Sequence, residues 1–476
     1  MRARDASDAH DATDATDGRG GGDARSTPDS GGDGGRNDAS DGGAGVIGCS
    51  GSVALTYDTT TDRAPHVASP PTLGPAGTIY KDPTYGTSVL RVTDAMTLPG
   101  SLSYRVANEF WGNDWSTDAK LFYLQDSSGA VLPYAFDPKT LVATRVADKT
   151  MPGSPLKMPL SSGGFSRTEP TILYGMKALT VAEFDFSTQT TTDVVDLTTV
   201  VPGATGNALG VQQAESGLLA SVFGGPEQDK MPYLATWDPV SKTPHVLDVT
   251  QSTLDGKPIG TTIGGGLHAF KLDVSGRYLA FEVNGGSSTD WVWDTTAGAV
   301  TTLPSLDTVG SAAWASKLSS ASYAWDLQTF ASPTMAVSLI TPAAPVDTMA
   351  SATLDWKNAT AGALSPLIVE TMRQPGDTTP WQAWDEEIIA VRTDGMLVPG
   401  EAGTPETEVW RFAHTFNTYT GTMFSDNYYY LFIPRVSQNG WFVLFDSNWN
   451  GSLGTDNNGQ PRTDAFIVAL PNPCGP

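Results

Sequence analysis

Four short segments with the same ending decide the fold of this chain. Each is an apolar run that closes with an aromatic residue and Asp, and a polar turn follows the Asp. The segments are YAFDPKT (residues 134–140), AEFDFST (182–188), ATWDPVS (235–241) and WVWDTTA (291–297). Their aspartates, Asp137, Asp185, Asp238 and Asp294, are 48, 53 and 56 residues apart. The pattern predicts a strand and a turn that recur once in each unit of a repeat.

The residues around these segments complete the repeat unit. After each turn another strand begins, as in LVATRVAD (141–148) and AVTTLPSL (299–306). A polar turn leading into a buried strand forms the other recurring element, in WSTDAKLFYL (115–124), DVSGRYLAFEV (273–283) and VSQNGWFVLFD (436–446). Repeats of short strands with this punctuation are typical of propeller blades, each of which needs its neighbours to cover its apolar faces.

The length of the repeat region sets the number of blades. About 390 residues at an interval near 52 give seven or eight units. We therefore predict an all-β fold, a single β-propeller of seven blades, with eight blades as the alternative. Two stacked sheets are the rival architecture, but they do not explain the regular interval.

The two ends of the repeat region complement each other. The last strands, WFVLFD (441–446) and AFIVAL (465–470), leave the fourth place in their blade empty. The early strand SVLRVTD (88–94) has no blade of its own. We expect it to fill that place and close the ring.

The chain divides into three parts. Residues 1–48 are a low-complexity Asp/Ala/Gly-rich stretch that we predict to be a disordered spacer; residues 49–84 are a linker, and residues 85–476 form the propeller. The spacer resembles those of bacterial lipoproteins, so we expect a secreted, cell-surface or periplasmic protein. VIGC (46–49) lacks the apolar core that precedes a lipobox. Membrane attachment is therefore expected only through a signal or lipid anchor upstream of Met1.

The two cysteines, Cys49 and Cys474, flank the predicted propeller. A disulfide between them explains both and fits an oxidising compartment, while two unrelated free thiols are the alternative. The formal net charge of −24 repels phosphate backbones, so nucleic acid is not an expected partner. We expect a monomer.

Several motifs are similar to those of secreted bacterial propellers of the Tol-type and oligogalacturonate-lyase-like group. They are RVTD (91–94), NEFWGNDWSTDAKLFYL (108–124), EVWRFAH (408–414), PRVSQNGWFVLFDSNW (434–449) and RTDAFIVAL (462–470). In the lyases, a manganese ion bound by histidines and a glutamine lies in the central cavity. A His-Pro-His cluster precedes the final strand pair there, whereas only His414 occurs at that point here.

Three residues are candidates for catalysis. We expect His268 on the innermost strand of a blade, His414 at a strand end and Arg435 on the innermost strand of the last blade. If they converge, Arg435 could neutralise a uronate carboxylate while a histidine removes the C5 proton. The alternative is that the histidines are ordinary hydrogen-bonded side chains and that Arg435 pairs with a nearby acid.

Two further sets of residues suggest binding. Aromatic side chains in or beside loops could stack on sugars or contact a protein, or else pack between blades: Trp111, Trp115, Trp381, Trp384, Tyr428, Tyr429 and Tyr430. Asp446, Asn448 and Asn450, followed by Gly451, match the first half of a calcium loop. Asn457 stands where the loop's bidentate acid belongs, which leaves a polar turn as the alternative.

Together these features favour an extracytoplasmic recognition module for a glycan or a protein surface. A uronate lyase working in the central cavity is the alternative function. Calcium and manganese are the cofactors that the candidate residues suggest, and no complete motif requires either ion.

Overall fold

The structure is a computed structural model of the 476-residue chain. The residues described are 57–100, 102–106, 113–284, 289–303, 308–309, 313–317, 325–330, 332–340, 349–353, 366–372, 380–393, 397–399, 405–418 and 434–471. All of them belong to the compact unit Ser50–Pro476. Cys49 and Cys474 lie outside these residues, so the disulfide stays a prediction, as does the 1–48 spacer. No helix in the described ranges is long and apolar enough to cross a membrane.

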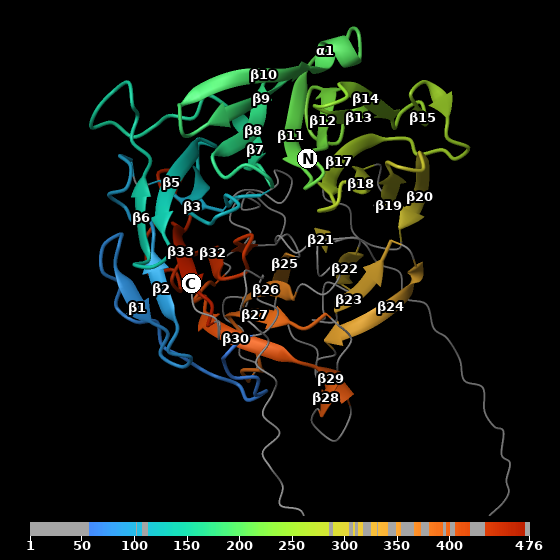
Figure 1. Cartoon of the computed structure of the whole chain (residues 1–476). Helices are drawn as coiled ribbons and strands as arrows, with labels where there is room; N and C mark the ends of the chain where they lie inside the picture. Colours follow the sequence, from blue (N-terminus) through green and yellow to red (C-terminus); the bar gives the residue numbers. More distant parts are fainter. Residues whose placement is uncertain are drawn as a thin grey trace, which may run out of the picture. The chain divides into compact units, whose positions relative to one another are not determined.

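The described strands form seven antiparallel sheets of four to six strands, arranged around a common centre as propeller blades (Figure 1). Blade 1 contains β3 (Tyr104–Arg105), β4 (Leu121–Asp126), β5 (Val131–Asp137) and β6 (Val142–Arg145). Blade 2 contains β7 (Ser161–Phe165), β8 (Ile172–Lys177), β9 (Thr180–Asp185) and β10 (Thr190–Asp196), followed by the single-turn helix α1 (Leu197–Val200). Blade 3 contains β11 (Asn207–Gln213), β12 (Leu219–Gly225), β13 (Tyr233–Asp238), β14 (Thr243–Asp248), β15 (Thr253–Leu254) and β16 (Lys257–Pro258).

The remaining blades follow the same order. Blade 4 contains β17 (Gly266–Leu272), β18 (Tyr278–Asn284), β19 (Thr289–Asp294) and β20 (Ala299–Leu303). Blade 5 contains β21 (Thr308–Val309), β22 (Ala313–Lys317), β23 (Trp325–Thr329) and β24 (Ser332–Ile340). Blade 6 contains β25 (Met349–Thr353), β26 (Leu367–Met372), β27 (Glu387–Val391) and β30 (Val409–His414), with a hairpin of β28 (Leu397–Pro399) and β29 (Pro405–Thr407) inserted before β30. Blade 7 contains β31 (Arg435–Val436), β32 (Phe442–Ser447), β33 (Asp464–Ala469), β2 (Ser88–Arg91) and β1 (Ile79–Lys81).

This topology confirms the seven-bladed propeller predicted from the sequence. In Figure 1 the first strands, such as β7, β17 and β25, lie nearer the centre than the fourth strands, such as β10, β20 and β30. Two stacked sheets are excluded, because the described strands of the ring fall into seven separate sheets, six of which are built from strands in chain order.

The recurring aspartates end the third strands of blades 1 to 4, where each carboxylate holds the following turn. Asp137 accepts a hydrogen bond from the backbone N–H of Lys139 at 3.0 Å, and Asp238 accepts one from Val240 at 2.9 Å. Asp185 and Asp294 accept equivalent bonds from the residues two positions later. An acceptor two residues before a donor needs no partner from elsewhere in the fold, which is why this motif recurs legibly in the sequence.

The early strand closes the ring as predicted. β2 pairs antiparallel with β33, with Val89 opposite Val468 and Leu90 opposite Ile467. Arg91 donates from Nε to the buried carboxylate of Asp464 at 3.0 Å. The last blade is therefore built from both ends of the repeat region.

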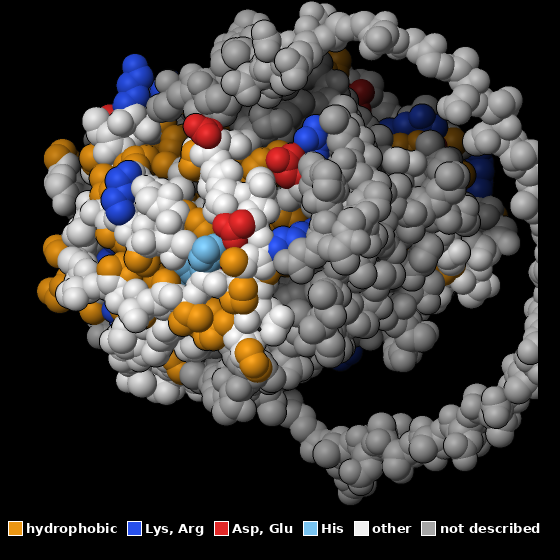
Figure 2. Space-filling view, turned by 90° about the horizontal axis from the view of Figure 1, so that it is seen from below, with side chains coloured by type: hydrophobic (Ala, Val, Ile, Leu, Met, Phe, Trp, Pro, Cys, Tyr) orange, Lys and Arg blue, Asp and Glu red, His pale blue; other side chains and the backbone are white. Residues whose placement is uncertain are grey.

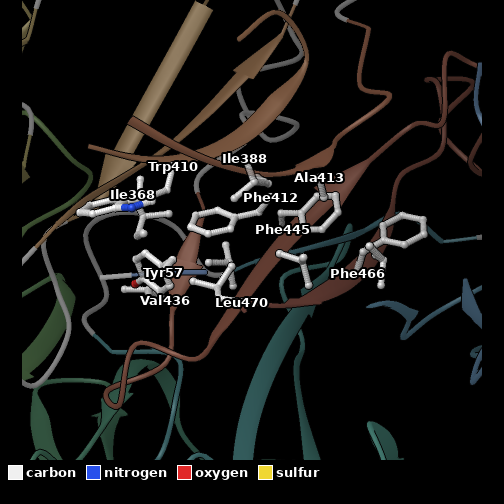
Figure 3. Packing of buried hydrophobic residues seen from close by; sticks show 14 of the residues in the cluster. Tyr57, Ile368, Ile388, Trp410, Phe412, Ala413, Val436, Phe445, Phe466 and Leu470 are labelled. Carbon is white, nitrogen blue, oxygen red and sulfur yellow. The ribbon is translucent and has the colours of Figure 1, made fainter. Parts of the chain in front are cut away.

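A large apolar cluster fills the seam between blades 6 and 7 (Figure 3). Ile388 and Phe412 come from blade 6, and Phe445 and Phe466 come from blade 7. A second cluster joins blade 7 to blade 1. In it, Leu90 and Ile467 of blade 7 pack with Phe122 and Phe136 of blade 1. Closure thus buries side chains on both sides of blade 7.

Residues 57–78, which we call the strap, run from this seam to β1. Tyr57 lies in the same cluster, and its hydroxyl donates to the carbonyl of Gly440 at 3.2 Å. Trp449 Nε1 donates to the carbonyl of Pro71 at 3.0 Å. The segment predicted as a linker (49–84) is therefore partly integrated into the fold, and β1 within it extends blade 7.

We predict that Leu90→Ala destabilises the propeller much more than Ile79→Ala. The two residues face each other across β1 and β2, but Leu90 is fully buried whereas Ile79 is 42% exposed. Truncating a buried leucine costs about 2–5 kcal/mol. Thermal melts followed by circular dichroism should show a clear fall for Leu90→Ala only. Equal melting temperatures of the two variants would contradict a closing role for β2.

Candidate functional site

One face of the ring gathers most of the polar side chains of interest. In each blade, neighbouring strands run in opposite directions. One side of the ring therefore contains the starts of the first and third strands and the ends of the second and fourth strands. We call this side the front face. Arg145 at the end of β6, His414 at the end of β30 and Asp446 near the end of β32 all lie on it.

His268 lies on β17, the innermost strand of blade 4, as predicted. Its Nδ1 is 2.5 Å from Asp229 Oδ1, and its backbone carbonyl accepts a hydrogen bond from Gln228 Nε2 at 2.8 Å. The side chain is 25% exposed. These contacts make His268 a hydrogen-bonded histidine at the front face.

His414 occupies a different environment, beneath the strap. Its side chain is fully buried, with Nδ1 at 3.1 Å from Asp82 Oδ2 and Nε2 at 3.0 Å from the carbonyl of His66. The ring stacks on Tyr85 at 5.2 Å. Burial lowers the pKa of His414, but the hydrogen bond and charge of Asp82 outweigh it and raise the pKa above its usual value.

The structure does not bring His268 and His414 together. His268 is on the first strand of blade 4, while His414 is on the fourth strand of blade 6, and blade 5 stands between these blades. Neighbouring strands are about 4.8 Å apart, so a fourth strand lies roughly 14 Å outward from the first strand of its blade. Two histidines so placed cannot share one metal ion.

Arg435 lies on β31, the innermost strand of blade 7, as predicted. Its side chain is 8% exposed, and its Nε is 3.6 Å from a carboxylate oxygen of buried Asp114. Its carbonyl accepts a hydrogen bond from Trp115 Nε1 at 3.0 Å. The alternative of a structural arginine paired with an acid therefore describes it better than a clamp for a uronate.

The predicted binding aromatics are mostly packing residues where the structure describes them. Trp115 is fully buried between blades 7 and 1, against Phe122 and Phe442. Trp384 is 3% exposed, with the Arg63 guanidinium 5.0 Å from its ring. Trp381 is half-buried. The other four, Trp111, Tyr428, Tyr429 and Tyr430, lie outside the described residues.

The half-motif for calcium does not form a ligand cage. Asn448 Oδ1 accepts hydrogen bonds from the backbone of Thr418 and Gly451, and Asn450 is exposed. The backbone turns left-handed at Trp449 and Asn450, with φ of 53° and 54°, which separates these side chains from buried Asp446. These contacts are those of a polar turn, and calcium binding by this loop stays a prediction. Elsewhere in the described ranges, no three His, Cys, Asp or Glu side chains are placed to hold a metal ion.

Asp446 instead interacts with Glu370, a residue that the sequence analysis missed. Both side chains are fully buried, with the Asn417 side chain beside Glu370 and the backbone of Val106 beside Asp446. Burial raises the pKa of Asp446 to about 8, against the opposing charge of Arg105. Burial and the charge of Asp446 raise the pKa of Glu370 well above its usual range. An acid inside the apolar run LIVETM (367–372) was the available signal.

A second buried network ties the strap to blade 6. Arg411 is fully buried and donates from Nε to Glu387 at 2.8 Å. Its Nη1 donates to the Asp62 carboxylate at 2.9 Å and to the carbonyl of Ala64 at 2.7 Å. The guanidinium therefore connects the strap to β27 and β30 at once.

A groove on the front face lies between blades 1 and 2. Its volume is about 630 Å³, and apolar side chains line most of it, from the ends of β5 and β8 and from residues 155–160. Three cations, Arg145, Lys157 and Lys177, and one acid, Asp126, stand among them. No aromatic side chain is among these lining residues.

The described surface can be followed on one further side of the molecule. Figure 2 shows one side of the molecule, on which hydrophobic side chains and charges of both signs are interspersed among uncharged groups. Such a mixture is ordinary for the surface of a folded protein. The groove is a described feature of suitable size and lining to hold a ligand.

Comparisons with known proteins add little to this description. No protein-family model matches the sequence, and no curated protein matches it. Two solved structures, "Structure of U3-55K" and "Crystal structure of RRP9 WD40 repeats", each share 10% identity over 77% of this chain and over 98% and 97% of their own chains. Their TM-scores are 0.39 and 0.35. At such values the blade assignment rests on the sheet topology alone, and the resemblance to the Tol-type and lyase-like group stays a prediction.

We predict that Arg411→Met destabilises the chain strongly. Removing one partner of a buried ion pair leaves an uncompensated charge on Glu387 and costs about 3–5 kcal/mol. Adding Glu387→Gln should recover part of the loss. The control Arg277→Met breaks the exposed pair with Asp294 and should barely change the melting temperature. Similar melting curves for Arg411→Met and Arg277→Met would refute the role of the strap network.

We also predict that Asp446→Asn stabilises the chain by an amount that grows from pH 5 to pH 8. The folded chain holds a proton on Asp446 up to about pH 8, whereas the unfolded carboxyl releases it near its ordinary pKa of 3.8. The free energy of unfolding therefore falls by about 1.4 kcal/mol for each pH unit within this window. The Asn side chain does not titrate, so the variant lacks this dependence.

The control for this experiment is Asp238→Asn. The pKa of Asp238 is lowered by the Ser241 hydroxyl, so this variant should be less stable than wild type at neutral pH. Melting temperatures measured across the pH range test both signs. If added Ca²⁺ raises the wild-type melting temperature but not that of Asp446→Asn, then Asp446 and Glu370 bind a cation, and the prediction that Asp446 holds a proton is wrong.

Proposed function

We propose that this propeller is a recognition module that binds a segment of another protein in the groove between blades 1 and 2. The observation that carries the proposal is the groove itself, an apolar depression of about 630 Å³ bordered by charged side chains on the front face. Pockets of this size with few polar groups are the usual form of a binding site.

Exposed apolar side chains beside the groove support a partner larger than a small molecule. Met151, in the connection that leads to residues 155–160, is 50% exposed. Met96 is 87% exposed and lies two residues before Leu98, which lines the groove. Large exposed hydrophobic residues around a depression favour docking of a protein segment.

The same geometry favours a protein over a glycan. Sugar binding depends on aromatic faces, and the groove has none. Trp115 and Trp384, which were candidates for stacking, are buried and unavailable. The groove's aliphatic side chains are better suited to the apolar side chains of a peptide.

The lyase alternative has no support from the described residues. His268, His414 and Arg435 lie on blades 4, 6 and 7, and each is engaged with its own acid: Asp229, Asp82 and Asp114. A base and a carboxylate clamp must meet at one substrate carbon, which this arrangement does not allow.

Selection from a phage-displayed library of random peptides tests the proposal. Wild-type protein should enrich peptides rich in apolar residues. Ala130→Trp should abolish their binding, because Ala130 is an exposed lining residue and the indole would fill the groove. Ala297→Trp, at an exposed turn on the opposite face, is the matched control and should bind normally. Binding that survives Ala130→Trp, or no enrichment by wild type, would overturn the proposal.

A further inference from the structure

The groove is locally cationic in a chain of net charge −24. Its three basic residues face one acid, Asp126, whose Oδ1 accepts hydrogen bonds from Ser128 N at 2.8 Å and Ala130 N at 3.0 Å. That carboxylate is occupied in holding a turn. Lys177 pairs at 2.6 Å with exposed Asp193, outside the groove. The excess positive charge on the groove wall is therefore left to Arg145 and Lys157.

Arg145 is the group in the groove that most needs a partner. Its guanidinium carbon lies 5.5 Å from the centre of the Tyr134 ring, and the side chain is half-buried. Its Nε and Nη1 are covered, no carboxylate pairs with the guanidinium in the described part of the chain, and the polar group beside it is the neutral Tyr134 hydroxyl. Donors on a desolvated charge that remain unsatisfied are costly, and a carboxylate that bridges two guanidinium nitrogens removes this cost.

We propose that the occupant of the groove is an acidic peptide segment, in which an Asp or Glu carboxylate pairs with Arg145 and flanking apolar side chains fill the groove. This inference rests on the proposed function and specifies its ligand. On binding, the long Arg145 side chain turns its Nε–Nη edge toward the groove, while the Tyr134 ring continues to support its other face. The ring limits the orientations of the guanidinium, which favours two-pronged pairing over a diffuse attraction.

Charge complementarity alone would not choose between Arg145 and Lys157. Lys157 is exposed, and an exposed ammonium gains little from pairing in water. Arg145 is half-buried beside aliphatic side chains, where a carboxylate would be partly withdrawn from water and the pair would be stronger. The acidic preference is therefore assigned to Arg145.

The experiment compares peptides selected on wild type with those selected on Arg145→Met. Wild type should enrich Asp or Glu between apolar residues, whereas Arg145→Met should retain the apolar preference and lose the acidic one. The matched control is Arg277→Met, because Arg277 also lies over a tyrosine ring, at 4.9 Å from Tyr278, but on the opposite face. It should behave as wild type.

Affinities of synthetic peptides, measured by fluorescence anisotropy, complete the test. One selected sequence is made with a free or amidated C-terminus and with its acid as Glu or Gln. Replacing Glu by Gln should weaken binding to wild type about tenfold, which is about 1.4 kcal/mol, and leave binding to Arg145→Met nearly unchanged. Amidation should have no effect. A loss on amidation alone would overturn the assignment to an acidic side chain in favour of a terminal carboxylate.

The remaining outcomes separate this inference from the proposed function. If Ala130→Trp abolishes binding but the selected peptides carry no acid, the groove is a binding site and the acidic ligand is wrong. If the acidic preference disappears in Lys157→Gln and persists in Arg145→Met, the assigned residue is wrong. If Ala130→Trp binds as wild type does, both proposals fail.

Discussion

The pairing of β2 with β33 is the constraint on which the rest of the structure depends. Every blade has two apolar faces, and only the neighbouring blades can cover them. A ring with a three-stranded last blade would leave the edge of β33 unpaired and expose the clusters on both sides of blade 7. The strand that prevents this comes from the start of the repeat region, so the two ends of the domain stabilise each other. The ion pair between Arg91 of β2 and Asp464 of β33 holds the two strands together inside the blade.

The strap extends the same closure beyond the sheet. Arg411 connects Glu387 of blade 6 to Asp62, and His414 is held by Asp82 just before the closing strand. These groups carry little chemistry for a ligand, because their hydrogen-bonding atoms are engaged with one another under a covering segment. His414, which was a candidate for catalysis from the sequence, and Arg411 attach the strap to the ring instead.

The groove lies between blades 1 and 2, on the other side of blade 1 from blade 7. Two of its lining residues, Leu98 and Leu132, also pack in the cluster that joins blade 7 to blade 1, so only substitutions at its exposed residues, such as Ala130, are expected to alter recognition without affecting closure. If the groove binds an acidic segment as proposed, the net negative charge of the chain would repel that segment from other parts of the surface. Specificity would then depend on where the positive charge lies and less on its amount.

The sequence by itself determined the repeat and the strand that closes the ring, and it limited the number of blades to seven or eight. The turn aspartates such as Asp137 and Asp238 were readable because each carboxylate binds an N–H only two residues away, and the hydrophobic periods are equally local. It also placed His268 and Arg435 on innermost strands, since order within a blade follows order in the chain. Only the tertiary structure decided which side chains meet. Trp115 is buried by a neighbouring blade, Asp446 interacts with Glu370 rather than with Asn448 and Asn450, and Arg145 becomes a groove residue because blade 2 stands beside it. Burial and convergence are set by contacts between blades that are far apart in the chain, and no local pattern encodes them.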